Sequence, residues 1–170
     1  MHSKTDYPDA PPRSARPSAP PPSRSQPYAD ESVCYLLSRV RALMTSEVQA
    51  ATLPRFQLNS TQASMLILLR RGQRSGADLA REVGLDASAV TRLLDKLESR
   101  GLVARTRSAA DRRVVDVALS AAGHAMLEGL QPIYTDMLEK ILAGFTPDEA
   151  DALQRLLKKI ILNHQTCTGK

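Results

Sequence analysis

Apolar side chains recur at helical spacing along most of this 170-residue chain. A first stripe predicts a helix within residues 30–57, which Pro54 is expected to close. Further helices are expected through MLILLRR to Gly72, through LAREV to Gly84 and through ASAVTRLLDKLESR to Gly101. A long helix, bent at Pro132, and a last helix complete the series. The first stripe comprises Val33, Leu36, Leu37, Val40, Leu43, Met44 and Val48, and the last comprises Leu153, Leu156, Leu157, Ile160 and Ile161.

Polar residues at the expected helix starts support these boundaries. Asn59 and Gln62 have the spacing of a capping box, in which each side chain bonds the other residue's backbone N–H. The sequence Thr146-Pro147-Asp148-Glu149 combines an N-cap, a proline at the first helical position and early acidic residues. The other expected N-caps are Ser75, Asp86 and Ser120.

One segment has the period of a strand instead. Val115, Val117 and Leu119 alternate with smaller or charged residues, which indicates a strand with one buried face. Residues 102–107 can supply an antiparallel partner, with a loop over 108–112. The loop and its flank carry Arg112 and Arg113, so this hairpin presents guanidinium groups to a negatively charged partner.

The helix after Asp86 separates into two faces. Val90, Leu93, Leu94 and Leu97 repeat at i, i+3, i+4 and i+7 and are expected in the core. The opposite face is small or hydroxylated near its start, so it can approach another surface closely. That face comprises Ser88, Ala89, Thr91, Arg92, Asp95 and Lys96.

Charge is concentrated in the same region. The chain has a net charge of +5, and residues 70–113 alone hold eleven basic and six acidic residues, also a net of +5. A basic segment of this kind is typical of a polyanion partner, although arginines that only solvate a helix surface give the same count.

Several classes of function are disfavoured. Two cysteines and three scattered histidines give neither a disulfide framework nor metal-ligand spacing, and no nucleophile elbow or glycine-rich phosphate loop occurs. We therefore expect no enzyme, metal or cofactor. The longest apolar run, residues 65–69, is too short for a membrane span, so a cytoplasmic, nucleoid-associated protein is expected.

The order helix, short turn, helix, hairpin predicts a helix-turn-helix with a wing. The second helix would enter the major groove of DNA, with Ser88, Thr91 and Arg92 near base edges, or with Arg92 on phosphate. Arg113 would enter the minor groove, held extended by Asp111, and Arg112 would meet phosphate. Ala89 and Lys96 complete the expected contact set.

The fold class expected is mainly α with a small β-hairpin. Residues 1–29, with eight of the eleven prolines, are predicted to be a disordered tail. The predicted parts are then an N-terminal dimerisation helix (30–57), a winged helix-turn-helix domain (58–119), C-terminal dimerisation helices (120–164) and a tail (165–170). Surplus apolar residues in the first and last helices favour packing against a second copy of the chain.

Together, VTRLLDKLE-x-RGLV, the following DRR and the helix start LS-x-x-G resemble the MarR family of dimeric winged-helix transcription regulators over residues 30–164. Asn59 and Ser120 stand where that family usually has threonine, and both can still cap a helix. The resemblance implies a homodimer that reads a pseudo-palindromic operator, by default as a repressor, with Asp111 and Arg113 matching the wing motif Asp-x-Arg.

The resemblance also implies release from DNA by a small phenolic or aromatic acid. ESVCYLLSRVRALM and LAGFT resemble members that regulate catabolism of aromatic or pyridine carboxylates. Lining candidates are Ser38, Arg39, Arg41, Met44, Arg55, Gln62 and Met65, although Arg39 could instead form an intersubunit ion pair and the methionines could be core. The alternative is a peroxide sensor using Cys34, against a buried, inert thiol. A winged helix used only for protein contacts is a third possibility.

Overall fold

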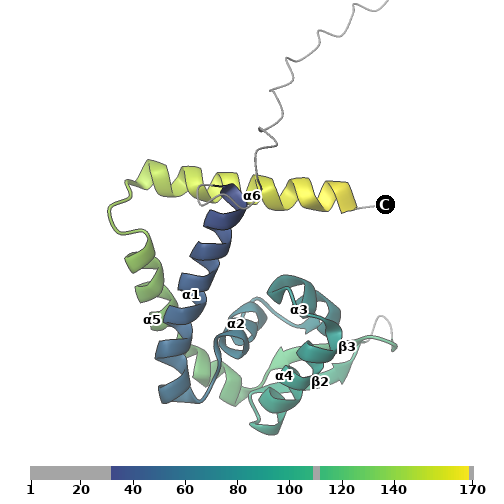
Figure 1. Ribbon diagram of the computed structural model, residues 1–170. Helices are drawn as coiled ribbons and strands as arrows, with labels where there is room; N and C mark the ends of the chain where they lie inside the picture. The colour runs from purple at the N-terminus through teal and green to yellow at the C-terminus, as the bar shows by residue number, and fades with distance from the viewer. Residues whose placement is uncertain (1–31, 109–111, 169–170) are drawn as a thin grey trace, which may run out of the picture. The chain divides into compact units, whose positions relative to one another are not determined.

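The computed structural model describes residues 32–108 and 112–168 (Figure 1). The chain divides into a unit that ends at Leu37 and a larger unit from Ser38 onward. In the described part of the first unit, Ser32 Oγ accepts the Tyr35 N–H at 3.1 Å where the first helix begins. The elements are α1 (Val33–Phe56), α2 (Ser60–Leu69), β1 (Arg74–Ser75), α3 (Gly76–Val83), α4 (Ala87–Ser99), β2 (Val103–Arg107), β3 (Val115–Leu119), α5 (Ala121–Ile141) and α6 (Pro147–Thr168).

The predicted helix starts are confirmed by their backbone partners. Asn59 Oδ1 accepts the Gln62 N–H at 2.8 Å, and Gln62 Oε1 accepts the Asn59 N–H at 3.1 Å. Ser75 and Asp86 cap α3 and α4 in the same way, and Gly84, at a left-handed φ of 69°, ends α3. Pro54 does not close α1, which continues to Phe56, because the loss of one N–H leaves the later bonds intact: the Gln57 N–H still bonds the Leu53 carbonyl at 3.0 Å.

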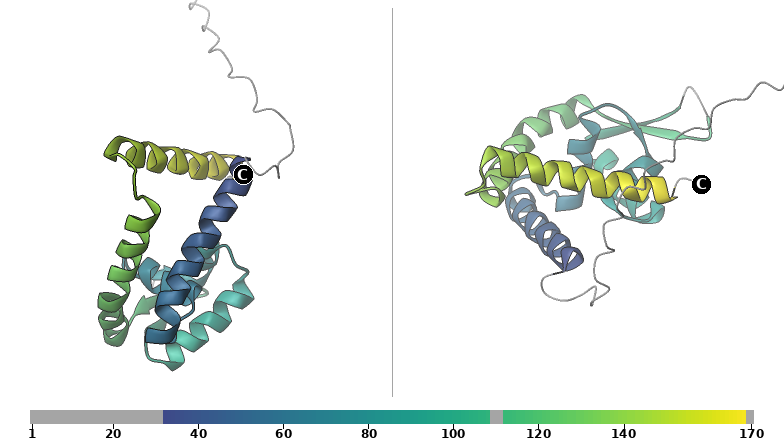
Figure 2. Two further views of the ribbon diagram at one scale, coloured as in Figure 1. Left: turned by 60° about the vertical axis from the view of Figure 1, so that its left-hand side comes forward. Right: turned by 90° about the horizontal axis from the view of Figure 1, so that it is seen from above.

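The hairpin is confirmed, and it belongs to a sheet of three strands. β2 pairs with β3 in antiparallel register from Val103–Leu119 to Arg107–Val115. The two-residue strand β1, which the sequence did not predict, pairs Arg74 with Val117 and Ser75 with Asp116, so the strand order is β1-β3-β2. Of the three alternating apolar residues, Val117 is buried, but Val115 is exposed because the hairpin extends beyond the helices (Figure 2).

The core lies under α2, α3, α4 and the sheet. Leu58, Met65, Leu66, Leu79 and Leu97 are fully buried there. Val90 and Leu94 of α4 are buried as predicted, whereas Leu93 is half-buried at the edge of the core. Fully burying side chains of this size stabilises a fold by roughly 1.5–3 kcal/mol each, so α4 is held on the lobe mainly by its apolar face.

The start of α5 is fixed against the sheet. Ser120 Oγ accepts the Gly123 N–H at 3.0 Å and donates to the Gly101 carbonyl. A Cβ on Gly123 would collide with the Leu102 carbonyl oxygen, so a side chain at this buried position would separate α5 from β2. The glycine of the LS-x-x-G segment is therefore required by a close backbone approach.

The terminal helices keep most of their apolar residues exposed in the single chain. Of the predicted α1 stripe, Val48 is buried and Met44 is half-buried, whereas the others are exposed. Burial of the α6 stripe is not seen within one chain, because no other described element covers it. The exposed large apolar residues of α6 are Leu153, Leu156, Leu157, Ile160 and Ile161 of the predicted stripe, and also Leu162.

Candidate nucleic-acid interface

The outward face of α4 has the predicted composition. Ser88, Thr91, Arg92 and Lys96 are exposed, and Ala89 is half-buried. The apolar residues of this helix point into the core, so the polar face is available to a partner. Helix α4 follows the tight turn Gly84–Asp86 after α3, which is the arrangement of a helix-turn-helix (Figure 1).

Hydrogen bonds organise the first turn of α4. Asp86 Oδ1 accepts the Ser88 hydroxyl at 2.6 Å and the Ala89 N–H at 2.8 Å. The Ser88 hydroxyl bond, followed by the backbone bond, holds the pKa of Asp86 below its usual value of 3.8. Ser88 Oγ in turn accepts from Arg92 Nη2 at 3.4 Å, and the Thr91 hydroxyl donates to the Ala87 carbonyl at 2.8 Å. The exposed side chains of this turn are therefore already oriented.

An arginine of the hairpin connects the sheet to α4. Arg105 Nη1 lies 2.6 Å from Asp95 Oδ1 and 3.3 Å from Glu98 Oε2, and Arg105 Nη2 donates to the Thr91 carbonyl at 3.1 Å. The side chain of Arg105 is only 23% exposed, so this contact is partly shielded from solvent. Asp95, expected only as part of the outer face, therefore fixes the hairpin.

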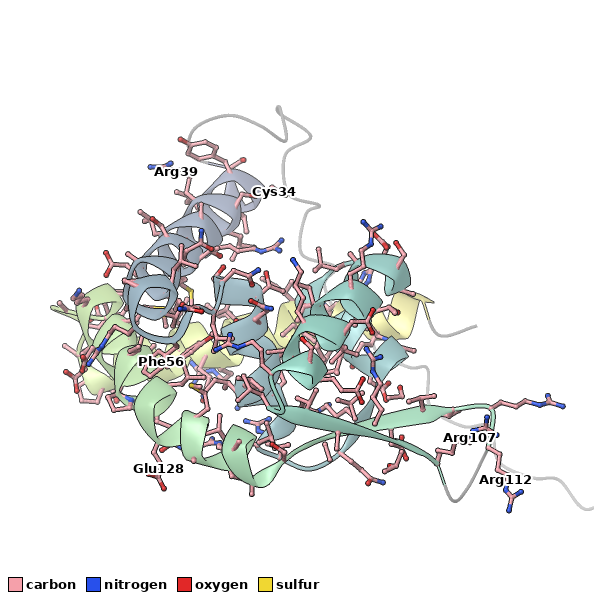
Figure 3. The ribbon with its side chains drawn as sticks, turned by 90° about the horizontal axis from the view of Figure 1, so that it is seen from below. Cys34, Arg39, Phe56, Arg107, Arg112 and Glu128 are labelled. Atoms are coloured by element: carbon pink, nitrogen blue, oxygen red, sulfur yellow. The ribbon has the colours of Figure 1, made fainter. Side chains whose placement is uncertain are left out.

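The hairpin ends in basic side chains. Figure 3 shows Arg107 and Arg112 at its far end, with their side chains directed away from the helices. Arg113 is also exposed, whereas Asp111, its predicted partner, lies outside the described residues. Arg107 was not among the predicted contacts, although its place at the end of a predicted strand beside the loop was the available signal. These three arginines and the α4 face form one candidate surface for a polyanion.

The predicted effector residues are not all brought together. Gln62 and Met65 are buried in α2, where Gln62 serves the capping box, and Met44 packs against the same core. Ser38 and Arg39 are exposed on α1 (Figure 3). A hollow of about 700 Å³ beside α1 contains two of the seven candidates, Ser38 and Arg41, and none of the other five. Its lining is Ser38, Arg41, Ala42, Thr45, Ser46, Gln49 and Ala50.

Other predicted or excluded features have clear positions. Cys34 is exposed in the single chain, whereas a buried thiol was expected, because the side of α1 that carries it is uncovered there. A half-buried polar pair was missed: Tyr134 Oη lies 3.0 Å from Ser64 Oγ, and partial burial raises the pKa of Tyr134. Among the described residues, no helix has both the length and the apolar character to cross a membrane, and no cluster of metal-ligand side chains occurs.

Comparison with known proteins shows which family this chain is similar to. Residues 58–115 match the family model described as MarR family. The HTH-type transcriptional repressor Rv2887 of Mycobacterium tuberculosis is 31% identical over 134 residues, covering 77% of this chain and 94% of the repressor.

Solved structures agree with this match. A mutant of MarR from E. coli, complexed with operator DNA, is 28% identical with a TM-score of 0.63 and covers 74% of this chain and 90% of that one. Bordetella bronchiseptica BpsR, whose DNA binding is regulated by 6-hydroxynicotinic acid, is 31% identical with a TM-score of 0.66 and covers 79% and 97%. The α4 face and the arginine-tipped hairpin thus stand in a winged helix-turn-helix, and the chain belongs to the MarR family of DNA-binding transcriptional regulators.

Proposed function

We propose that this chain is a homodimeric repressor that binds a pseudo-palindromic operator and is released by a small aromatic acid. The observation that carries the proposal is the pairing of an exposed, pre-oriented α4 face with exposed apolar stripes on α1 and α6. The first surface suits DNA, and the second suits another copy of the chain. Such a protein would act in the cytoplasm, on the nucleoid.

Affinity arithmetic supports a dimer. One winged helix makes few phosphate contacts, and nonspecific binding is of order 10⁻⁴–10⁻⁶ M. Two copies that engage half-sites about one helical turn apart can reach roughly 10⁻⁸–10⁻¹¹ M. In this assignment Ser88, Thr91 and Arg92 read base edges, with Ala89 allowing close approach and Lys96 on phosphate. Arg113 enters the minor groove with Asp111 beside it, and Arg112 meets phosphate.

The effector assignment rests on likeness and on chemistry. BpsR, which responds to 6-hydroxynicotinic acid, matches nearly its whole length to this chain. Arg41 lies in the hollow beside α1 with hydroxyl and small apolar side chains, and Arg39 is exposed on the same helix. A guanidinium beside apolar surface suits an anionic ring compound. Met44, Gln62 and Met65, which lie in or against the core, would line the effector site only after the core opens on binding.

The experiment is a mobility shift of the purified chain on DNA from its own upstream region. We expect a specific complex at nanomolar concentration, which dissociates on titration with 6-hydroxynicotinate or a related aromatic carboxylate. Arg41→Met should remove the effector response and keep the complex, and Arg155→Met on α6 is the matched control. Absence of any retarded DNA would contradict the operator assignment and favour a module for protein contacts. An intact complex with every acid would contradict the effector assignment alone.

Exposure of Cys34 favours a second candidate, a thiol-based peroxide sensor. Here oxidation of Cys34, instead of an aromatic acid, would release the DNA. In this case peroxide should dissociate the complex of the unmodified chain and leave that of Cys34→Ser intact. Equal behaviour of the two proteins in peroxide would eliminate this candidate.

A further inference from the structure

Arg100, the residue after the last turn of α4, reaches across to the end of α1. Its Nη2 donates to the Phe56 carbonyl at 2.7 Å, and its Nη1 donates to the Gln57 carbonyl at 2.9 Å. Both carbonyls belong to the C-terminus of α1, where backbone acceptors lack helical partners and the helix dipole is negative. A planar guanidinium with two parallel donors matches this pair of acceptors.

The carbonyls that Arg100 holds lie in a tightly fixed corner. Gln57 has a left-handed φ of 53°, and its N–H bonds the Leu53 carbonyl at 3.0 Å. The buried Thr52 hydroxyl donates to the Leu58 carbonyl at 2.9 Å, which ties the next residue to α1. The Phe56 ring lies against α5, where a Cβ on Gly129 would come within 2.8 Å of it (Figure 3). A corner fixed at three points transmits the direction of α1.

Arg100 is not needed to hold α4 on the lobe. Arg100 is exposed, and α4 is anchored by the buried side chains of Val90, Leu94 and Leu97. Arg105, by contrast, acts inside the lobe, because it joins α4 to β2. The two arginines therefore separate two tasks, the internal shape of the reading lobe and the angle of that lobe to α1.

We infer that Arg100 is a positioning residue, which couples the direction of α4 to that of α1 and so sets the separation of the two α4 copies on DNA. The inference rests on the proposed dimer and its two-half-site operator. A dimer joined through its terminal helices can match only operators whose half-site spacing agrees with the lobe angle. A less fixed angle between the lobe and α1 would weaken binding to an operator with two half-sites. It would leave the DNA contacts of each single lobe intact.

The test uses the full chain and an operator obtained by selection from random duplexes. Three kinds of DNA are compared: the selected operator, the operator with one half-site scrambled, and two operators with one base pair added to or removed from the spacer. For Arg100→Met we expect about tenfold weaker binding to the operator, which corresponds to roughly 1.4 kcal/mol. Binding to the half-site DNA should change less than about twofold, and the penalty for altered spacing should shrink. Arg100→Lys, with one compact donor group, should lie between.

Arg105→Met serves as the contrasting variant and should weaken half-site and operator binding alike. Equal loss on both DNAs for Arg100→Met would overturn the inference and assign Arg100 to folding or to a phosphate contact. Unchanged binding on all three DNAs would overturn it as well. If the proposed dimer itself is wrong, the unmodified chain will bind the complete operator no more tightly than the half-site DNA. That result is distinct from any effect of Arg100→Met.

Discussion

Arg105 on β2 and Asp95 on α4 form an ion pair with an N–O distance of 2.6 Å, which joins the wing hairpin to the helix of the proposed DNA contacts. A second carboxylate, Glu98, lies 3.3 Å from the same nitrogen. The wing and α4 are therefore oriented together before any DNA is present. This relationship yields the first prediction.

Arg105→Met should lower the free energy of unfolding by about 1 kcal/mol, since the charge-assisted bonds are partly shielded but Asp95 is more than half exposed. Operator affinity should fall as well, because the wing loses its orientation. Urea unfolding and a binding titration measure the two effects. Arg81→Met, which removes an exposed i,i+3 pair with Asp78, is the control and should change neither. A stability equal to that of the unmodified chain would contradict the shielding argument.

Gly123→Ala should destabilise the chain by about 3 kcal/mol, because the new Cβ would collide with the backbone carbonyl of Leu102. Backbone cannot move aside as a flexible side chain can. Gly76→Ala is the matched control, since a Cβ there meets no atom within 4 Å and its helical position favours alanine. Thermal unfolding of the two variants should move in opposite directions, and similar midpoints would show that the α5–β2 contact is looser than described.

Arg113→Ala should weaken operator binding and reduce the salt dependence of the affinity. Each phosphate or minor-groove contact that is lost lowers the slope of log affinity against log salt by about 1 per wing. A fluorescence titration at several salt concentrations gives the slope. Lys158→Ala removes a charge from exposed α6 and should leave the slope unchanged. An unaltered slope for Arg113→Ala would remove the wing from the interface.

Asp86→Asn should make the free energy of unfolding less dependent on pH in the acidic range. The pKa of Asp86 is lowered in the folded chain, so its cap stabilises the fold above the unfolded value of 3.8 and is lost as pH falls through the lower folded value. The asparagine variant keeps a capping oxygen without a charge. Its thermal midpoint should be below that of the unmodified chain at neutral pH, and the difference should disappear at strongly acidic pH. A difference that is constant with pH would contradict the assignment.

Ile160→Asp should convert the proposed dimer to a monomer at micromolar concentration. Ile160 lies on the exposed apolar stripe of α6, so a charge there adds no strain within one chain but would be buried unpaired between two. Light scattering measures the mass, and circular dichroism shows whether helices are retained. Arg155→Asp, on the opposite side of α6, should remain dimeric. A dimeric Ile160→Asp protein would exclude this stripe from the interface.

Helix starts could be predicted from sequence because their bonds are local. The Asn59–Gln62 box and the Asp86 cap each span three residues, so side-chain type and spacing specify the contact. The alternation of Val115, Val117 and Leu119 likewise specified a strand, although it did not show that the outer end of the hairpin leaves the core. Most elements of the winged helix-turn-helix could therefore be predicted from local sequence patterns.

The contacts missed from sequence join distant segments. β1 has two residues, and its pairing with β3 connects positions 41 and 43 residues apart, where no periodicity can develop. Arg100 and Arg105 belonged to a basic segment that suggested DNA contact, whereas both guanidinium groups bind within the protein. Exposure of Cys34 was missed for another reason: the apolar pattern of α1 shows that a face needs covering and does not show whether the same chain covers it.

The short strand β1 has a mechanical consequence. Ser75 pairs with Asp116 in the sheet, and its hydroxyl also receives the Asp78 N–H that begins α3. Ser75 therefore links the wing directly to α3, the first helix of the helix-turn-helix. No loop separates the two, so a displacement of β3 is passed on to α3. A duplex that is bent or overwound would therefore meet the wing and α3 as one linked unit, and most of the distortion would fall on the nucleic acid.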